Sequence, residues 1–424
     1  MPSASTGYLH FQPALRGHYP AGNPVRIRDC RATVWGETRL ESGYPLAHPG
    51  VIPRGGHPRT PRKGPDRKAG PYVTASRFPF RSPVSTISAL AVVALALTSC
   101  SAGDVGDSAG KPAPHETTGA YPVTLANCGR EITIDEPIES AVALNQGITE
   151  ILLSMGLDDR VAGTGTWTDP VRENLAEANA DIPRLSDDNP SFETVLGAEP
   201  DFVAASFHNT LDDTGSGSFD QYAELGVPAY LASTECSKAN FDGDGARENK
   251  LSMDAIYRDV RDLGVLFDEV EAGEALITEL ESRVKAASAH KAAPGTTAAF
   301  WFANSEAPYM AGGVGAPQII ADALGVENAF ADSDLEWPQI SWEEIAAQDP
   351  DVLVIGDLTR KSQTAESAKA KIEFLESHPV ASQLRAVKEK RYIALPGADL
   401  NPSIRTVDGI ETVAAKLAEF GLLG

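Results

Sequence analysis

The chain has 424 residues, of which 42% are hydrophobic, and a formal net charge of −23 at pH 7. This length exceeds that of one small domain and is enough for two lobes, each with its own hydrophobic core. The excess of Asp and Glu argues against nucleic acid and anionic lipid surfaces as binding partners.

Residues 1–72 are rich in Pro, Gly, Arg and His and show no sustained apolar period. They precede a segment typical of N-terminal signals, so we interpret them as a translated upstream sequence. Residues 22–34, GNPVRIRDCRATV, can be back-translated into a string that resembles the conserved core of a cobalamin riboswitch, and residues 41–45, ESGYP, into its later conserved box. Codon degeneracy permits this interpretation without requiring it. Under this interpretation, vitamin B12 controls the gene.

Residues 73–99 have the features of a secretion signal. Arg77 and Arg81 precede the uncharged run ISALAVVALALTSC, whose apolar part is too short to span a membrane as a helix. Its end, LTSC, resembles the lipobox of bacterial lipoproteins, in which the cysteine is lipidated and becomes the first residue of the mature protein. This resemblance implies a lipid anchor at Cys100, on the extracytoplasmic face of the cell membrane. The alternative is a cleaved signal beside an incidental cysteine.

The acidic excess lies after the signal. Residues 1–99 contain 13 of the 36 Lys and Arg but 4 of the 59 Asp and Glu, so the remainder has a net charge of −32. Residues 100–120 are rich in Ser, Gly, Ala, Asp and Pro and are predicted to form a flexible tether.

Cys128 and Cys236 are the two cysteines that follow Cys100, and they form an even pair in an oxidising compartment. We predict a disulfide between them, with two buried free thiols as the alternative.

From Tyr121, alternating strand and helix patterns predict an α/β lobe over residues 121–267. The predicted elements are a hairpin around 127–129, strands at 141–144, 161–163, 202–206 and 228–231, and helices at 145–155, from 191 to before 199, at 219–225 and at 251–266.

The polar segment 233–249 imitates part of an EF-hand calcium loop. Leu251 stands where such a loop needs a bidentate Glu, so we interpret the segment as a solvated acidic loop, with a calcium site as the alternative. No other metal site is predicted. The residues that imitate the loop are Asn240, Asp242, Asp244, Gly245 and Glu248.

A pattern of helix, Pro-Asp and strand occurs twice in the chain. This internal repeat predicts two similar, Rossmann-like α/β lobes, the second over residues 293–424. Between them, residues 268–292 carry an apolar stripe of helical period. We predict one long connecting helix there, with a surface helix of one lobe as the alternative. The recurring residues are Ser191 and Ser341, Glu193 and Glu343, Pro200 and Pro350, and Asp201 and Asp351, each pair 150 residues apart.

No signature of a nucleotide-binding loop, zinc protease, serine hydrolase or dithiol redox enzyme is present in the sequence. We predict no catalytic residues and no cofactor; a lipid-anchored hydrolase or metal enzyme is the alternative of a different class.

Aromatic residues occur in loops after predicted strands, which favours a cleft for a large, partly apolar ligand. The candidate ligand-binding residues are Trp167, His208, Trp301, Tyr309 and Trp337, with Asp399 and Arg405 as polar anchors. Packing in a core or interface is the alternative for each aromatic residue.

The chain from Tyr121 to Gly424 resembles the solute-binding proteins of the bacterial importers for vitamin B12, ferric siderophores and haem. This resemblance implies two α/β lobes joined by one long helix, a ligand cleft between the lobes, and no enzymatic activity. The resemblance is carried by ALNQGITEILLSMGL from Ala141, SFETVLGAEPDFV from Ser191, ELGVPAYL from Glu224, APYMAGGVGAPQII from Ala307, EWPQISWEEIAAQDPDVLV from Glu336 and ALPGADLNPSIRT from Ala394.

The resemblance also suggests site residues and partners. Vitamin B12-binding members have aromatic residues at the positions of Trp167, Tyr309 and Trp337. They also have glutamates at the positions of Glu193 and Glu343 that pair with arginines of the permease. The resemblance thus implies a monomer that binds a corrinoid, or alternatively a ferric siderophore or haem, and docks on an ABC permease dimer with a cytoplasmic ATPase. From the residues alone, both glutamates are also explained as N-terminal helix charges stabilised by the helix dipole.

Overall fold

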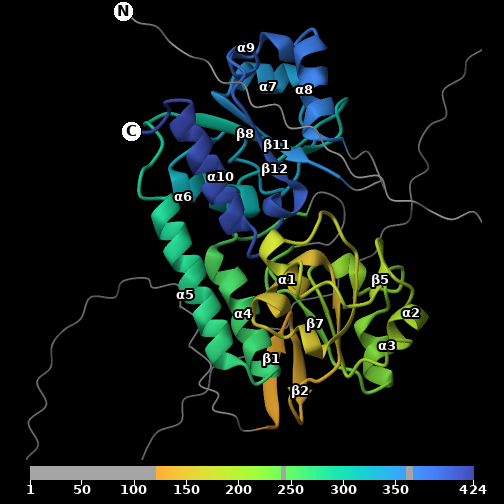
Figure 1. Cartoon of the computed structure of the whole chain (residues 1–424). Helices are drawn as coiled ribbons and strands as arrows, with labels where there is room; N and C mark the ends of the chain where they lie inside the picture. The colour runs from red at the N-terminus through yellow and green to blue at the C-terminus, as the bar shows by residue number, and fades with distance from the viewer. Residues whose placement is uncertain (1–120, 240–244, 360–365) are drawn as a thin grey trace, which may run out of the picture. The chain divides into compact units, whose positions relative to one another are not determined.

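The computed structural model describes residues 121–239, 245–359 and 366–424, all of which belong to one compact unit (Figure 1). The upstream sequence, the signal, the tether and Cys100 lie outside the described residues, as do residues 240–244 of the loop that imitates an EF-hand. The described part contains two mainly parallel β-sheets, each with its own helices. The prediction of two α/β lobes is therefore confirmed.

The first lobe is built on a parallel sheet with the strand order β5-β4-β3-β6-β7. Its central strands are buried along their whole length, which explains their continuous apolar sequences. The strands are β3 (Ala141–Leu144), β4 (Val161–Gly165), β5 (Arg184–Ser186), β6 (Phe202–Ala205) and β7 (Ala229–Leu231). The helices are α1 (Gln146–Ser154), α2 (Phe192–Leu196), α3 (Phe219–Glu224) and α4 (Met253–Leu266), with 3₁₀ turns η1 (Asp158–Arg160), η2 (Glu173–Leu175) and η3 (His208–Thr210).

The predicted hairpin consists of the antiparallel strands β1 (Val123–Asn127) and β2 (Arg130–Ile134). Alternate residues of both strands are buried in the core that α4 also joins, as expected for a sheet with one solvated face. The structure contains the predicted disulfide: Cys128 at the hairpin turn is bonded to Cys236, and their Cα atoms are 4.6 Å apart. The bond ties the hairpin to the segment that follows β7.

The second lobe has parallel strands in the order β10-β8-β11-β12, with β9 antiparallel to β8. Its strands are β8 (Thr297–Ala303), β9 (Tyr309–Met310), β10 (Glu327–Asn328), β11 (Val352–Asp357) and β12 (Tyr392–Pro396). Its helices are α6 (Ala316–Leu324), α7 (Trp342–Gln348), α8 (Ala368–Ser377), α9 (Arg385–Lys388) and α10 (Thr406–Glu419), with 3₁₀ turns η4 (Ala381–Gln383) and η5 (Gly397–Leu400).

The repeated serines begin equivalent helices. The Ser191 hydroxyl accepts a hydrogen bond from the Thr194 backbone N–H at 3.2 Å, and the Ser341 hydroxyl accepts one from the Glu344 backbone N–H at 3.2 Å. Each serine thus satisfies a donor that the helix itself leaves free. The repeat therefore reflects a local requirement for starting α2 and α7.

The repeated aspartates anchor the strands that follow these helices. Asp201 precedes β6, and its carboxylate accepts hydrogen bonds from the backbone N–H groups of Ser140, at 3.0 Å, and Glu139, at 2.9 Å. Asp351 precedes β11 and accepts from the Thr297 backbone N–H at 3.0 Å. Since β6 pairs with β3 and β11 with β8, each aspartate fixes its strand to the first strand of its own sheet.

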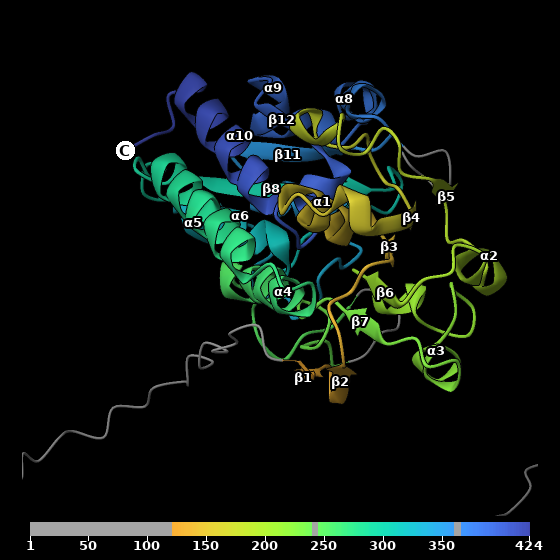
Figure 2. The ribbon, with the colours of Figure 1, turned by 60° about the horizontal axis from the view of Figure 1, so that its bottom comes forward.

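The predicted connecting helix is α5 (Val270–Ala287), which is shorter at both ends than the predicted range. In Figures 1 and 2 it runs beside α4 and reaches α10 of the second lobe. Leu276, Ile277 and Leu280 are buried in the first core, while Val284 and Ala287 pack on the second. The helix therefore contacts both lobes and holds them through its apolar stripe.

Candidate ligand-binding site

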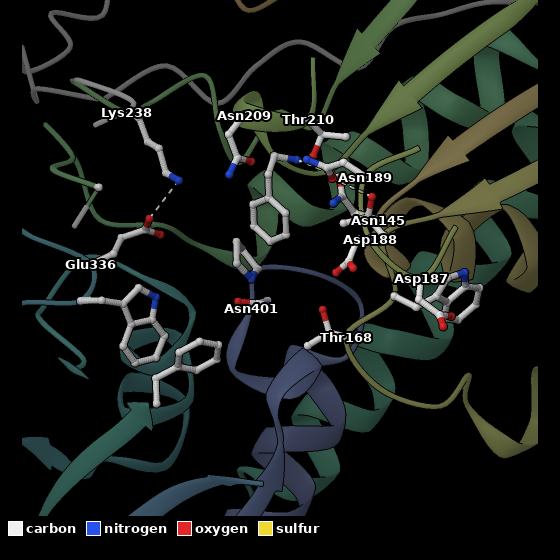
Figure 3. Close-up of a pocket in the computed structure, with 17 residues that line it drawn as sticks. Asn145, Thr168, Asp187, Asp188, Asn189, Asn209, Thr210, Lys238, Glu336 and Asn401 are labelled. Atoms are coloured by element: carbon white, nitrogen blue, oxygen red, sulfur yellow. Dashed lines mark hydrogen bonds and ion pairs between the residues drawn. The ribbon is translucent and has the colours of Figure 1, made fainter. Parts of the chain in front are cut away.

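A pocket of about 510 Å³ lies between the two lobes (Figure 3). Its walls come from the loops after β3, β4, β5 and β6, from the segment after β7, and from three segments of the second lobe. Carboxyl ends of parallel strands meet at one edge of a sheet, which brings the loops of the first lobe together. The lining residues are Asn145, Thr166, Trp167, Thr168, Asp187, Asp188, Asn189, Phe207, Asn209, Thr210, Lys238, Gly245, Phe302, Glu336, Trp337, Asn401 and Pro402.

Asn145 joins two of these loops. It follows β3, has a positive φ of 76°, and is 3% exposed. Its Oδ1 accepts hydrogen bonds from the Ser206 backbone N–H at 2.9 Å and from the Thr210 hydroxyl at 3.2 Å. Its buried hydrogen bonds therefore fix this part of the pocket wall.

Aromatic rings from both lobes line the pocket. Trp337 and Phe302 of the second lobe pack on each other, with ring centroids 4.8 Å apart and planes inclined by 37°. Trp167 of the first lobe is 8% exposed, and the Arg184 guanidinium lies over its ring at 4.4 Å. Phe207 adds a half-buried ring. Flat rings of this kind suit a ligand with broad apolar faces.

Of the seven predicted ligand-binding residues, Trp167 and Trp337 line this pocket. Tyr309 is half-buried in β9, beside β8, and does not belong to the lining. His208 is also outside the lining, although both of its chain neighbours belong to it. The His208 backbone N–H donates to the Glu235 carboxylate at 3.1 Å, which holds η3 to the segment after β7.

Trp301 was predicted to bind the ligand, but it lies outside the pocket lining. Its side chain is 0% exposed and packs edge-on against Trp342 in the core of the second lobe, with ring centroids 5.1 Å apart. Because β8 continues to Ala303, Trp301 is a strand residue, and successive strand residues point to opposite faces of the sheet. Trp301 is therefore a core residue, while its neighbour Phe302 contributes the ring that lines the pocket.

Arg405 and Asp399 belong to an ion cluster that joins the lobes beside the pocket. Arg405 Nε and Nη2 donate to the Glu150 carboxylate at 2.7 and 2.6 Å, and Arg405 Nη1 lies 3.5 Å from Asp399 Oδ1. Glu150 and Arg405 line a recess that shares Thr168 and Asn401 with the main pocket. Both predicted anchors are therefore engaged by other side chains outside the main lining, and Arg405 holds the start of α10 to α1.

Asp399 predicts a pH dependence of stability. Burial, opposed by Arg405 and reinforced by Asp408 and Asp169, raises the pKa of Asp399 to about 7. An unfolded Asp titrates near a pKa of about 3.9, so the folded state binds this proton more tightly. We therefore expect Asp399 to destabilise the fold progressively as the pH rises from about 4 to about 7. Asp399→Asn should flatten this part of the curve in urea unfolding across the range; an unchanged slope would contradict the assignment.

A second ion cluster joins the lobes at the pocket wall. Lys238 Nζ lies 2.7 Å from Glu235 and 3.2 Å from Glu336, and Arg247 Nη2 lies 2.7 Å from Glu336. The Arg247 side chain is fully buried, and that of Glu336 is 7% exposed. Backbone hydrogen bonds also join residues 245–247 of the first lobe to residues 334–336 of the second lobe. At these residues the loop predicted to be solvated is buried, because its charges meet partners on the second lobe.

Glu193 and Glu343 are exposed in the first turns of α2 and α7, one on each lobe. The Ser191 hydroxyl donates to Glu193 Oε2 at 2.9 Å. Hydrogen bonds from the backbone N–H of Glu193 and from the Ser191 hydroxyl hold the pKa of the Glu193 carboxyl below its usual value. The two lobes therefore present equivalent acidic side chains to solvent.

Several lining residues, Asp188 and Phe302 among them, were not predicted from the sequence. β5 contains no apolar run, so neither this strand nor the polar loop after it, Asp187–Asn189, is predicted. Phe302 could have been found from strand alternation, since it lies on the face opposite to Trp301. The charges of Lys238 and Glu336 are visible in the sequence, but their mutual contact is not.

Neither a membrane-spanning helix nor a metal cluster occurs in the described ranges. None of the helices within residues 121–239, 245–359 and 366–424 is long and apolar enough to cross a membrane. Over the same ranges, no group of three or more His, Cys, Asp or Glu side chains is placed to hold a metal ion.

Two α/β lobes, one connecting helix and a pocket between the lobes define a two-lobed solute-binding protein. The chain belongs to the periplasmic binding protein family, whose model matches residues 142–398. Members of this family are substrate-binding proteins of ABC transporters and not enzymes. This chain is accordingly a solute-binding protein of an ABC importer.

Comparison with individual proteins agrees with the family. The chain is 22% identical over 335 residues to the uncharacterized ABC transporter substrate-binding lipoprotein YvrC of Bacillus subtilis, covering 78% of this chain and 95% of YvrC. It is 28% identical over 280 residues to a cobalamin-binding protein of Halobacterium salinarum, covering 63% and 68% of the two chains. A solved protein of the Fe3+-hydroxamate transport system of Saccharomonospora viridis has the same fold, with a TM-score of 0.57, 23% identity and coverage of 70% and 99%.

Proposed function

We propose that this protein captures a corrinoid outside the cytoplasmic membrane and delivers it to the permease of its importer. The observation that carries the proposal is the pocket, in which rings from both lobes, including Trp167 and Trp337, alternate with amide and hydroxyl groups. A corrin ring has two broad apolar faces and an edge of carboxamide groups. Rings can cover its faces while the polar groups bind its edge.

The lining chemistry argues against haem. None of the described residues that line the pocket is His, Tyr, Met or Cys, which are the usual axial ligands of haem iron. Within the part of the lining that the structure describes, Lys238 is the single cation, and it is already paired with Glu235 and Glu336. The haem propionates would therefore meet no available positive charge. A neutral ferric siderophore, such as a hydroxamate complex, remains the second candidate, because it needs neither a cation nor an axial ligand.

Two further observations favour a corrinoid over a siderophore. The relative from Halobacterium salinarum is named a cobalamin-binding protein. The peptide from Gly22 to Val34 also permits a nucleotide sequence resembling the core of a cobalamin riboswitch. The DNA that encodes these residues is a direct check, since codons that do not spell this core would remove the second argument.

We also propose that the protein is anchored to the membrane through a lipid on Cys100. The support is the lipobox-like LTSC sequence and the name lipoprotein given to YvrC. A lipid anchor together with a tether over residues 100–120 would keep the binding protein near its permease, which raises the local concentration for docking.

Titration of the purified protein with cyanocobalamin tests the ligand, because the pocket tryptophans should report binding by quenched fluorescence. Trp337→Ala should weaken binding about tenfold, since a stacked ring contributes about 1.4 kcal/mol. Trp337→Phe is the matched control and should retain most of the affinity. Ferrioxamine and haemin are titrated in parallel. Saturation by ferrioxamine without any response to cyanocobalamin would replace the corrinoid by a siderophore.

Docking is tested through Glu193 and Glu343. We propose that these exposed carboxylates, one on each lobe, pair with basic side chains of a two-fold symmetric permease. In cells carrying the variants, Glu193→Lys or Glu343→Lys should lower uptake about tenfold or more while ligand affinity stays unchanged. Glu344→Lys, on the same exposed turn of α7, is the control and should have a much smaller effect. Equal uptake by all three variants would contradict docking through this pair.

A further inference from the structure

Among the described residues, one carboxylate of the pocket lining has no charged or hydrogen-bonding partner. Of the three lining carboxylates, Glu336 is paired with Lys238 and Arg247, and Asp187 is paired with Arg184 at 2.9 Å. Among the described residues, the Asp188 carboxylate has neither a hydrogen-bond nor an ion-pair partner. In Figure 3 it points into the pocket, toward Thr168.

The backbone holds Asp188 in this position. Its N–H donates to the Ser186 hydroxyl at 3.1 Å, and its carbonyl accepts from the Thr166 N–H at 3.1 Å. On the next residue, the Asn189 side chain accepts from the Thr166 hydroxyl at 2.9 Å. The loop after β5 is thus fastened to the loop after β4. The Asp188 backbone therefore has a defined place in the pocket wall.

Asp188 also leaves the pocket with an unbalanced negative charge. Among the described residues that line the pocket, Lys238 is the single cation, and two carboxylates already contact it. A carboxylate without a partner accepts hydrogen bonds from N–H donors and repels other anions. Its chemistry therefore bears on which ligands the pocket accepts.

We propose that Asp188 is a specificity-determining residue that accepts a hydrogen bond from an N–H group on the ligand and discriminates against anionic ligands. This inference rests on the proposed function, because it selects among corrinoids. Ligands whose peripheral carboxamides are intact are preferred, and those in which an amide is hydrolysed to a carboxylate are disfavoured. An ionised carboxyl group lacks the N–H donor and adds a like charge close to Asp188.

The test compares cyanocobalamin with its monocarboxylic acid derivatives, in which one peripheral amide is hydrolysed. Wild-type protein should bind cyanocobalamin about tenfold more tightly than the least favoured derivative, and high salt should reduce this ratio because it screens the repulsion. In Asp188→Asn, which keeps the shape of the side chain but removes its charge, the ratio should fall to about threefold or less. Asp213→Asn, an exposed carboxylate outside the lining, should leave the ratio unchanged.

The possible results separate this inference from the proposed function. If the wild-type protein binds no corrinoid, the proposed function and the inference both fail. If it binds corrinoids with the same ratio in wild type and Asp188→Asn, the proposed function stands and the role of Asp188 is refuted. Because Asp188 is exposed and its carboxylate makes no hydrogen bond or ion pair among the described residues, the Asn variant should keep the thermal stability of the wild type.

Discussion

Replacing Glu150 by alanine is expected to lower the free energy of unfolding by about 3 to 5 kcal/mol, because Arg405 would be left as a buried charge without its main partner. The Glu150 side chain is 0% exposed and that of Arg405 is 7% exposed. Glu150 accepts two hydrogen bonds from Arg405, one from the Arg172 backbone N–H at 3.1 Å and one from the Gln146 side-chain amide at 3.0 Å. Urea unfolding followed by tryptophan fluorescence measures the loss.

Two variants show whether the loss comes from the orphaned charge. The double variant Glu150→Met with Arg405→Leu removes both charges and should be less destabilised than Glu150→Ala. Lys416→Ala breaks the exposed pair of Lys416 with Glu419 and should cost less than about 1 kcal/mol. If Glu150→Ala behaves like Lys416→Ala, this ion pair does not hold the lobes together.

The second large effect is expected at Arg247. Its guanidinium donates to the Ser237 hydroxyl at 2.9 Å and lies 2.7 Å from Glu336, and its side chain is fully buried. Arg247→Met would leave Glu336 buried with Lys238 as its one remaining cation, so we expect a loss of about 3 to 5 kcal/mol. Since Glu336 lines the pocket, the same variant should also weaken ligand binding.

Hydrogen exchange locates the effect of Arg247→Met. Within segments 245–251 and 334–336, the amides of Arg247, Leu251 and Glu336 donate across the lobes and should exchange faster in the variant, while the hairpin of β1 and β2 should not change. Arg261→Met is the matched control, because its pair with Glu274 is partly exposed and should contribute less than about 1 kcal/mol. Unaltered exchange at both segments would show that backbone hydrogen bonds alone hold the lobes at this wall.

Much of the fold was accessible from local sequence patterns. The hairpin, the buried strands β3 and β6, and the helices α4 and α5 follow from apolar periodicity and turn residues, which act over a few neighbouring positions. The 150-residue repeat marked α2, β6, α7 and β11 because the same capping serine and anchoring aspartate are needed in both lobes. β5 was not predicted, since its three residues form no apolar run.

The site was less accessible, because its members come from distant parts of the chain. Trp167 and Trp337 were found as aromatic residues in loops after strands. Trp301 faces the core instead, because it lies within β8, where successive side chains point to opposite faces of the sheet. Arg405 was chosen as a ligand anchor, yet its partner Glu150 lies 255 residues away and no sequence pattern connects them. Asp188 was missed together with the strand that positions it.

The amino-acid sequence by itself determined that this chain forms two α/β lobes with a connecting helix and a disulfide, because helix periods, strand runs, caps and cysteine counts are local or additive properties. Tertiary structure alone decided which aromatic faces reach the pocket, which charges pair across the lobes and which carboxylate remains unpaired. Those outcomes depend on strand ends and on the packing of one lobe against the other, and both are settled only when residues hundreds of positions apart come into contact.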